Sequence, residues 1–535
     1  MTKIIGFTIS EKEINHEDID VFNRDLNQIQ FFANNLYVYL WGVGDIKSCK
    51  INNKYTLSFP LNDDLLDRNI IIDISNETIT IENDWLGSIP VFYNKEEKII
   101  STLSLKTFTN TQIHNEGLHN FFEFGYNVFE QTPFKNVKFM RYFSKLFFSK
   151  KGIRIEYKED PALQKEIWDE VSDEKKVFEK IKNYINNVEE KTKDEIILPT
   201  SGGYDSRLLN LCVNDKTRIN SFTYGLSTKQ DESYEVVHAK KISEILKTKH
   251  KQIKLDNYYK YIPEWFKIFG FSTHLHGMYH IEFYEKILSE FTFSENTTFL
   301  SGIFGDVWAG LVTTQNITSY TNLNKLAYSH GLHGNISKII QNSNFGIKKD
   351  FWEQNKTILD NSKIRICFLI RIKIILISYL ATIPEYFGFP VWTPFLNFNI
   401  AKDMLNLPQE RRNNREWQAD IFKGNNLDLE NMNLKKDFSN TLDFDIFMNF
   451  NFEPINKTIL SKYIDEKYIE DINKNMSKKY HFRMYKFYNK LFKIRYVAGG
   501  LYRLGFRQKK YKNILLPAEY NIIKAIELAL NYTNK

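Results

Sequence analysis

The pattern of apolar and polar positions changes about a third of the way along the chain. Before residue 160, short runs rich in β-branched and aromatic residues alternate with Asn, Asp and Gly, as at Leu36–Trp41, Ile70–Ile74 and Thr78–Glu82. Such runs, bounded by turn residues, are typical of strands. Residues 1–160 are therefore predicted to form a sheet-rich α+β domain.

A helical period follows a charged stretch that contains Pro161. Val177, Ile181, Ile185 and Val188 are spaced three or four residues apart, which places them on one face of a helix. We therefore put the domain boundary between residues 160 and 170.

Two apolar runs then flank a second predicted helix. Ile196–Leu198 leads into a glycine-containing turn, and Ile219–Tyr224 reads as the next strand. A strand, a helix and a strand in this order predict a βαβ unit in a parallel sheet. From about residue 262 the pattern is mainly helical. Residues 170–535 are thus predicted to be an α/β domain with a helical C-terminal part.

Composition narrows the class of protein. The chain has 535 residues, enough for more than one core, and its 42% hydrophobic and 15% aromatic content is too apolar for a disordered chain. The net charge of +7 is modest for this length and does not favour a nucleic-acid partner.

Cysteines and apolar segments bear on the compartment. The three cysteines are far apart and lack C-x-x-C spacing, which favours a reducing environment. The apolar N-terminus meets charges at Glu11 and Lys12, unlike a signal peptide. The run Ile366–Ile383 contains Arg371 and Lys373, and a charge at mid-bilayer costs about 2.5–3.5 kcal/mol. We predict a core helix, no transmembrane segment and a cytoplasmic protein.

The segment Leu198–Ser206 carries the strongest chemical signal. A strand runs into Ser-Gly-Gly, and a helix is expected to begin near Asp205. Two glycines let the backbone approach an anion, and free N–H groups with the helix dipole stabilise a phosphate. Asp205 could hold the Mg²⁺ that accompanies a nucleotide. The alternative is a tight turn with a helix N-cap.

The run Ser201-Gly-Gly-Tyr-Asp-Ser206 resembles the signature of the pyrophosphate-loop ATPases. Within that group the chain is similar to asparagine synthetase and β-lactam synthetase, because further motifs follow the family's arrangement: Asp84–Tyr93, Ser221–Leu226 with Asp231, Leu300–Asp306, Trp392–Asn397 and Leu434–Phe438. The resemblance implies an Ntn-hydrolase-like glutamine amidotransferase sandwich, followed by an adenine-nucleotide α-hydrolase-like synthetase domain with a parallel sheet.

The resemblance also implies a site and a reaction. A carboxylate would attack the α-phosphate of ATP to give an acyl-adenylate and pyrophosphate, and ammonia or an amine would then form the amide. Asp205 and Asp306 would bind Mg²⁺. Lys435 matches the family's catalytic lysine by its spacing to Phe438, with Lys436 as the fallback. ATP contacts would come from Ser201, Gly202, Gly203, Asp205, Ser206, Tyr224, Gly225, Ser301 and Gly302.

Several positions depart from the family pattern. Thr2 stands where glutamine-hydrolysing members expose a cysteine, and a thiol is the better nucleophile near neutral pH. Ile303 replaces a Glu or Tyr and cannot transfer a proton, and Asn397 replaces an Asp. We expect an inactive glutaminase domain and leave the acceptor open among small-molecule, glycan and peptide carboxylates. The alternative is a degenerate protein that binds ATP or a partner without turnover.

Two further clusters have open interpretations. His274, His276 and His280 could bind zinc with a fourth ligand, contact substrate or lie on the surface. Residues 477–512 contain no acidic residue and many lysines and arginines, which fits contact with an anionic surface or a solvated helix face.

Overall fold

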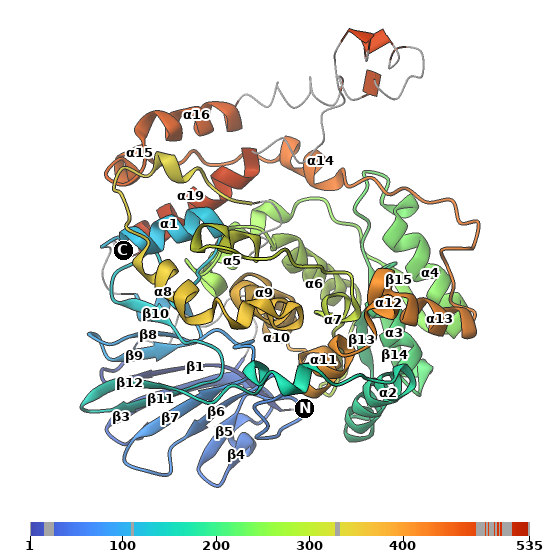
Figure 1. Ribbon diagram of the computed structural model, residues 1–535, viewed down its shortest axis with the longest axis horizontal. Helices are drawn as coiled ribbons and strands as arrows, with labels where there is room; N and C mark the ends of the chain where they lie inside the picture. The colour runs from blue at the N-terminus through green and yellow to red at the C-terminus, as the bar shows by residue number, and fades with distance from the viewer. Residues whose placement is uncertain are drawn as a thin grey trace.

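Antiparallel sheets form the first part of the chain and a parallel sheet with helices forms the rest. The computed structural model describes residues 2–14, 26–108, 112–326, 332–477 and 516–532, with isolated positions between 487 and 504. The antiparallel sheets lie at one end of the molecule and the parallel sheet on the opposite side, with helices between them (Figure 1). The basic segment 477–512 lies almost wholly outside the described residues.

The first part consists of two six-stranded antiparallel sheets. One has the order β10 (Val137–Phe139), β8 (Phe92–Asn94), β9 (Ile99–Ser101), β1 (Lys3–Ser10), β3 (Leu36–Val43) and β2 (Asn27–Ala33). The other has the order β12 (Gly152–Tyr157), β11 (Ser144–Ser149), β7 (Ile79–Asn83), β6 (Ile70–Asp73), β5 (Lys54–Thr56) and β4 (Lys50–Ile51).

An apolar core joins the two sheets. Phe7 and Val38 of the first sheet pack in one cluster with Ile72 and Leu146 of the second. All eight residues of β1 are buried, because this strand is covered by the rest of the protein on both faces. The strands predicted around residues 36–41, 70–74 and 78–82 are confirmed as β3, β6 and β7.

The second part contains a five-stranded sheet with every strand parallel. Its order is β15 (Lys249–Gln252), β14 (Ile219–Thr223), β13 (Ile196–Pro199), β16 (Thr298–Leu300) and β17 (Val391–Trp392). The predicted βαβ unit is confirmed as β13, α3 and β14. The sequence pattern missed β15, whose four residues are all polar, and β16 and β17, which have only three and two residues.

Helices account for most of the remaining described structure. They are α1 (Asn115–Phe124), α2 (Glu174–Lys191), α3 (Tyr204–Cys212), α4 (Tyr234–Leu246), α5 (Ile262–Phe269), α6 (Met278–Glu290), α7 (Gly305–Ala309), α8 (Gly346–Asn355), α9 (Ser362–Ile377), α10 (Tyr379–Tyr386), α11 (Phe398–Leu405), α12 (Gln409–Arg412), α13 (Glu416–Gly424), α14 (Leu442–Asn449), α15 (Lys457–Leu460), α16 (Glu466–Ser477) and α19 (Leu516–Tyr532). The predicted helix at Val177–Val188 is α2, which buries that apolar face.

The most apolar helices, α9 and α10, lie in the core. In the described part of the chain, residues 362–386 form the one helical stretch long and apolar enough to cross a membrane, and 83% of its most apolar window is buried inside the protein. Arg371 in α9 is paired with Asp160 through two hydrogen bonds, at 2.6 and 2.9 Å, and donates to the carbonyl of Trp85. The charge inside this apolar run is therefore neutralised by the N-terminal part, and the stretch packs as a core helix.

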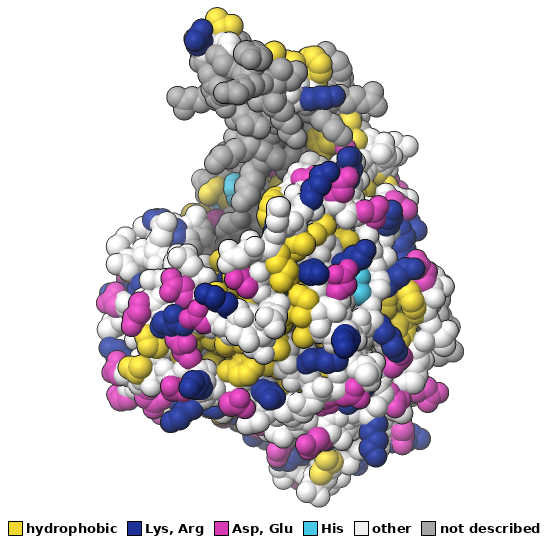
Figure 2. Space-filling view, turned by 90° about the vertical axis from the view of Figure 1, so that its right-hand side faces the viewer, with side chains coloured by type: hydrophobic (Ala, Val, Ile, Leu, Met, Phe, Trp, Pro, Cys, Tyr) yellow, Lys and Arg dark blue, Asp and Glu magenta, His cyan; other side chains and the backbone are white. Residues whose placement is uncertain are grey.

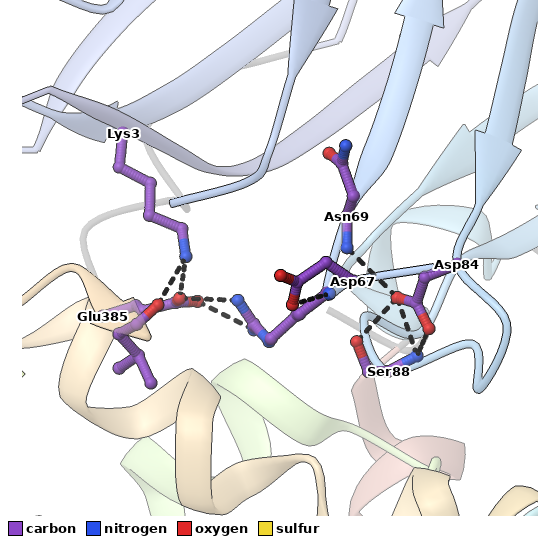
Figure 3. A network of polar contacts seen from close by, with 8 residues as sticks. Lys3, Asp67, Asn69, Asp84, Ser88 and Glu385 are labelled. Atoms are coloured by element: carbon purple, nitrogen blue, oxygen red, sulfur yellow. Dashed lines mark hydrogen bonds and ion pairs between the residues drawn. The ribbon is translucent and has the colours of Figure 1, made fainter. Parts of the chain in front are cut away.

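A buried ion network fastens β1 to α10. The Glu385 carboxylate of α10 accepts from Lys3 and, at 2.7 and 3.0 Å, from Arg68 (Figure 3). Beside it, Asp84 accepts backbone N–H groups of Leu86 and Ser88 and holds the turn after β7. Sequence reasoning did not anticipate this network.

The surface turned toward the viewer in Figure 2 mixes charges of both signs. Lysine and arginine side chains alternate with aspartate and glutamate, and apolar side chains gather between them. On this face the charges do not build a field of one sign, in keeping with the modest net charge of +7.

Candidate functional site

The loops that follow β13 and β16 meet at a switch point of the parallel sheet. β13 pairs with β14 on one side and β16 on the other, so the connections turn in opposite directions from this point. In open parallel sheets, ligands bind in the crevice at the carboxyl ends of strands where the order reverses. Both nucleotide loops predicted from the sequence, 201–206 and 300–306, leave the sheet at this edge.

The first loop is held by hydrogen bonds within itself. The N–H of Ser201 donates to Oγ of Ser206, and the N–H of Gly203 donates to Oγ of Ser201, each at 3.1 Å. A Cβ at Gly202 would lie 2.6 Å from the Tyr234 ring, so this position accepts only glycine without a shift. Helix α3 begins inside this segment, at Tyr204.

Asp205 and Asp306 come into direct contact across the two loops. The N–H of Asp306 donates to Oδ2 of Asp205 at 2.7 Å, while Oδ1 of Asp205 is buried without a hydrogen-bond partner among the described residues. Burial, followed by the nearby charge of Asp306, raises the pKa of Asp205, and burial also raises that of Asp306. Two half-buried acids with one unused, buried oxygen are the kind of donors that a hard cation requires.

The glycines of the second loop, which lack a Cβ, allow the loop to approach Asp205 closely. A Cβ at Gly305 would lie 2.6 Å from Cγ of Asp205, and one at Gly302 would lie 3.2 Å from its Cβ. Ser301 continues the strand pairing by donating its N–H to the carbonyl of Trp392. Gly302 and Ser301 therefore bring Asp306 to Asp205.

The carboxylate pair fits Mg²⁺ held together with a nucleotide better than a metal held by protein alone. Among the described residues, no group of three or more His, Cys, Asp or Glu side chains could hold a metal ion. Mg²⁺ is usually bound by one or two carboxylates, with phosphates and water completing six ligands. Asp205 and Asp306 match that requirement.

Two cations that the sequence reasoning missed act on the pair. The charge of Arg415 lowers the pKa of both carboxyls, although burial outweighs it. Its guanidinium lies 4.2 Å from the Tyr204 ring centroid, and its backbone has a positive φ of 60°. Lys373 of α9 is close enough to interact with Asp306, and burial lowers its pKa to about 8. Neither residue lies in a recognisable motif.

Arg207 ties the first loop to the C-terminal segment 427–430. Its side chain is fully buried, and it donates to the Gly202 carbonyl at 3.0 Å and to the Glu430 carboxylate at 2.8 and 2.9 Å. It also donates to the carbonyl of Leu427. This arginine, the residue after Ser206, fixes both the loop and the segment that leads to the two lysines.

The two candidate lysines differ in placement. Nζ of Lys436 donates to Nε2 of His238 at 2.7 Å, and burial, with the Lys436 charge, lowers the pKa of His238 to about 4, so this imidazole is neutral. Lys435 is exposed to solvent. The Lys436 side chain therefore points toward the loop, which differs from the ranking given by sequence spacing.

Tyr234 connects His238 to loop 201–206. Its hydroxyl donates to the Gly202 carbonyl at 2.9 Å, and its ring is stacked on Phe438 with centroids 4.9 Å apart. The N–H of Tyr234 donates to the carbonyl of Asp437, pinning the lysine segment to α4. Tyr234 and His238 are one helical turn apart, a spacing that could have flagged them, although it is common on buried helix faces.

Other residues that the sequence predicted to contact ATP are packed closely against neighbouring residues. Tyr224 packs with its ring 5.1 Å from Phe283 and 5.9 Å from Tyr279 of α6. Gly225 lies against the backbone of Gln230, so a side chain there would clash. Ile303 is buried in an apolar cluster.

The three histidines of the cluster differ in burial, since His274 is buried and His276 and His280 are half-buried. His274 is fully buried and its Nδ1 bonds to the Gly125 carbonyl at 2.7 Å, which excludes a surface position. Burial lowers the pKa of His280 to about 3, so it is neutral.

Thr2 is half-buried, immediately before β1. The three cysteines are buried and free.

Comparison with models of known protein families returned no match, and comparison with curated proteins returned none. The function is therefore inferred from the geometry of these residues and from the motifs in the sequence.

Proposed function

We propose that the chain is an ATP- and Mg²⁺-dependent ligase of the asparagine synthetase kind, which activates a carboxylate as an acyl-adenylate and joins it to ammonia or another amine. The observation that carries the proposal is the contact between Asp205 and Asp306 at the switch point, beside the Ser-Gly-Gly loop. Two acids brought together on adjacent strand ends, with one oxygen left unpaired, need a cation to offset their repulsion.

The chain's own residues divide the work by position. The backbone of loop 201–206 and the start of α3 favour the leaving pyrophosphate. Bound Mg²⁺ would offset the phosphate charge, held by Asp205 and Asp306. Lys436, fixed by the neutral imidazole of His238, would face the charge that develops at the α-phosphate. Arg415 and Lys373 add positive charge on the other side of the pair.

The finer fold assignment belongs to the same proposal. The parallel sheet with a glycine loop after β13 supports an adenine-nucleotide α-hydrolase-like domain, and the antiparallel sandwich supports an Ntn-hydrolase-like domain. In that arrangement Thr2 occupies the nucleophile's place at the start of β1, so we propose that this domain is no longer a glutaminase.

Product analysis tests the proposal. The purified chain is incubated with Mg²⁺, ATP labelled at the α-phosphate and a panel of sugar acids, peptides and amino acids. We expect AMP and pyrophosphate to appear with at least one carboxylate, and to disappear in Asp205→Asn. Release of ADP and phosphate instead would replace this chemistry with another.

A non-catalytic nucleotide-binding protein is the second candidate. Ile303, which is buried and apolar where related enzymes place a proton-transferring side chain, favours it. ATP binding that depends on Asp205, without AMP formation across the panel and without exchange of labelled pyrophosphate into ATP, would support this candidate over the ligase.

A further inference from the structure

A cavity separate from the nucleotide loops lies between the antiparallel sandwich and helices α8 and α9. Its volume is about 300 Å³, at the lower end of small-molecule sites. The inner wall is apolar and the mouth is polar. The apolar wall includes Leu86, Phe139, Met140, Phe351, Ile372 and Ile375.

Arg141 is the charged group at this cavity that lacks a partner. Its guanidinium lies between two aromatic rings, 4.9 Å from the Tyr142 centroid and 4.6 Å from that of Tyr157. Its Nε is buried and without a hydrogen-bond partner, and in the described part of the chain Arg141 forms no ion pair with a carboxylate. A buried donor left unsatisfied is unfavourable, and an acceptor atom of a ligand would satisfy it.

The other charged groups of the wall are already engaged or solvated. Arg371 is paired with Asp160. Glu130 accepts the Tyr157 hydroxyl at 2.9 Å and interacts with Arg141 through its charge without forming an ion pair, and Lys138 and Asp350 are exposed to solvent. Among the charged groups of the wall, Arg141 is therefore the half-buried cation that no carboxylate pairs with in the described part of the chain.

The backbone at the mouth is strained. Phe129 and Glu130 both have positive φ values, 54° and 58°, which non-glycine residues rarely adopt in succession. Such conformations persist where the surroundings hold them and are common at ligand sites. The strain lies next to Arg141 in the cavity wall.

We propose that this cavity binds a small organic carboxylate with a flat apolar body. The carboxylate would pair with Arg141 through the planar guanidinium, which two tyrosine rings hold in place, and the body would lie on Ile372 and Ile375. The proposal does not rest on the ligase function, because none of its residues belongs to the nucleotide site.

The test uses phenylacetate as the probe and phenylacetamide as its uncharged match. Binding to the full chain is followed by saturation-transfer NMR titration. A ligand of this size reaches a dissociation constant of about 1 mM at ordinary ligand efficiency. We expect phenylacetate to bind at about this level and phenylacetamide at least fivefold more weakly.

Variants locate the binding. Arg141→Gln should remove the difference between acid and amide. Gln354→Trp, at the mouth, should weaken phenylacetate at least tenfold, while Glu353→Trp, on the same helix but outside the cavity wall, should not. Asp205→Asn should leave binding unchanged, which separates this cavity from the proposed substrate site.

Equal binding of acid and amide to the parent would overturn the proposal, as would unchanged acid binding by both Arg141→Gln and Gln354→Trp. Absence of binding by the parent would do the same. A thermal unfolding midpoint of Arg141→Gln within a few degrees of the parent shows that the variant is folded.

Discussion

At the scale of single residues, the site combines two acids that repel each other with a lysine aimed by a neutral histidine. His238 can accept from Lys436 only while it is unprotonated, and burial keeps its pKa at about 4. The pair therefore stays intact at neutral pH. In the proposed reaction, a preorganised cation of this kind would stabilise the transition state more than the ground state.

Comparison of the two lysines tests this placement. Removing one such preorganised donor costs about 10²–10³ in turnover. We expect Lys436→Ala to lower pyrophosphate release by that factor with ATP affinity within a few-fold, and Lys435→Ala, the matched control, to have a small effect. The reverse ranking would restore the sequence-based choice of Lys435.

Asp67 gives a pH-dependent prediction outside the site. It accepts the Tyr184 hydroxyl at 2.8 Å, yet burial raises its pKa to about 6. As the pH rises, Asp67 therefore ionises at a lower pH in the unfolded chain than in the folded chain. The contribution of Asp67 to stability is present below about pH 4 and is lost as the pH rises through 6. The loss is at most about 3 kcal/mol.

We expect Asp67→Asn, which cannot ionise, to gain stability relative to the parent between pH 5 and pH 7.5. Urea unfolding at pH 5 and at pH 7.5 measures the free energy of unfolding of both proteins. Asp63→Asn, at an exposed position, is the control. A loss of stability in Asp67→Asn over this pH range, or an equal gain in Asp63→Asn, would refute the raised pKa of Asp67.

At the scale of elements, the ion pair between Arg207 and Glu430 connects loop 201–206 to the segment that carries the two lysines. Arg207 is fully buried, whereas Glu430 is 40% exposed, so the carboxylate joins a segment at the surface to a buried arginine. Glu430→Gln should speed hydrogen exchange in peptides covering residues 427–438 several-fold. Glu416→Gln, which breaks an exposed pair with Arg411, should not. Unchanged exchange in both would mean that backbone contacts alone hold the segment.

Elements with a clear apolar run or a helical period could be predicted from sequence. α2 and the strands β3, β6 and β7 show it. β16 and β17 could not, since they have three and two residues. Motif spacing predicted that Asp205 and Asp306 act together, and the structure shows them in contact, but the orientation of Lys436 depends on contacts with α4 that are far away in sequence.

At the scale of the whole molecule, the N-terminal sandwich is joined to the helices by buried charge. The Glu385 carboxylate pairs with both Lys3 and Arg68, and all three side chains are nearly inaccessible to solvent. Removing one partner of such a network leaves uncompensated buried charge, which typically costs about 3–5 kcal/mol.

Glu385→Gln should lower the free energy of unfolding by about that amount in a urea titration. Adding Lys3→Met should recover part of the loss, because one stranded cation is removed. A single variant as stable as the parent would show that the network contributes no net stability.

The central claim is that Asp205 and Asp306 jointly hold the metal of a nucleotide bound at the end of β13. A crystal structure with a non-hydrolysable ATP analogue and Mn²⁺ in place of Mg²⁺ tests it most directly, because Mn²⁺ is located by its anomalous scattering. We predict one Mn²⁺ at coordination distance from both carboxylates, with phosphates against loop 201–206. A nucleotide bound elsewhere, or a metal that contacts neither carboxylate, would contradict the account.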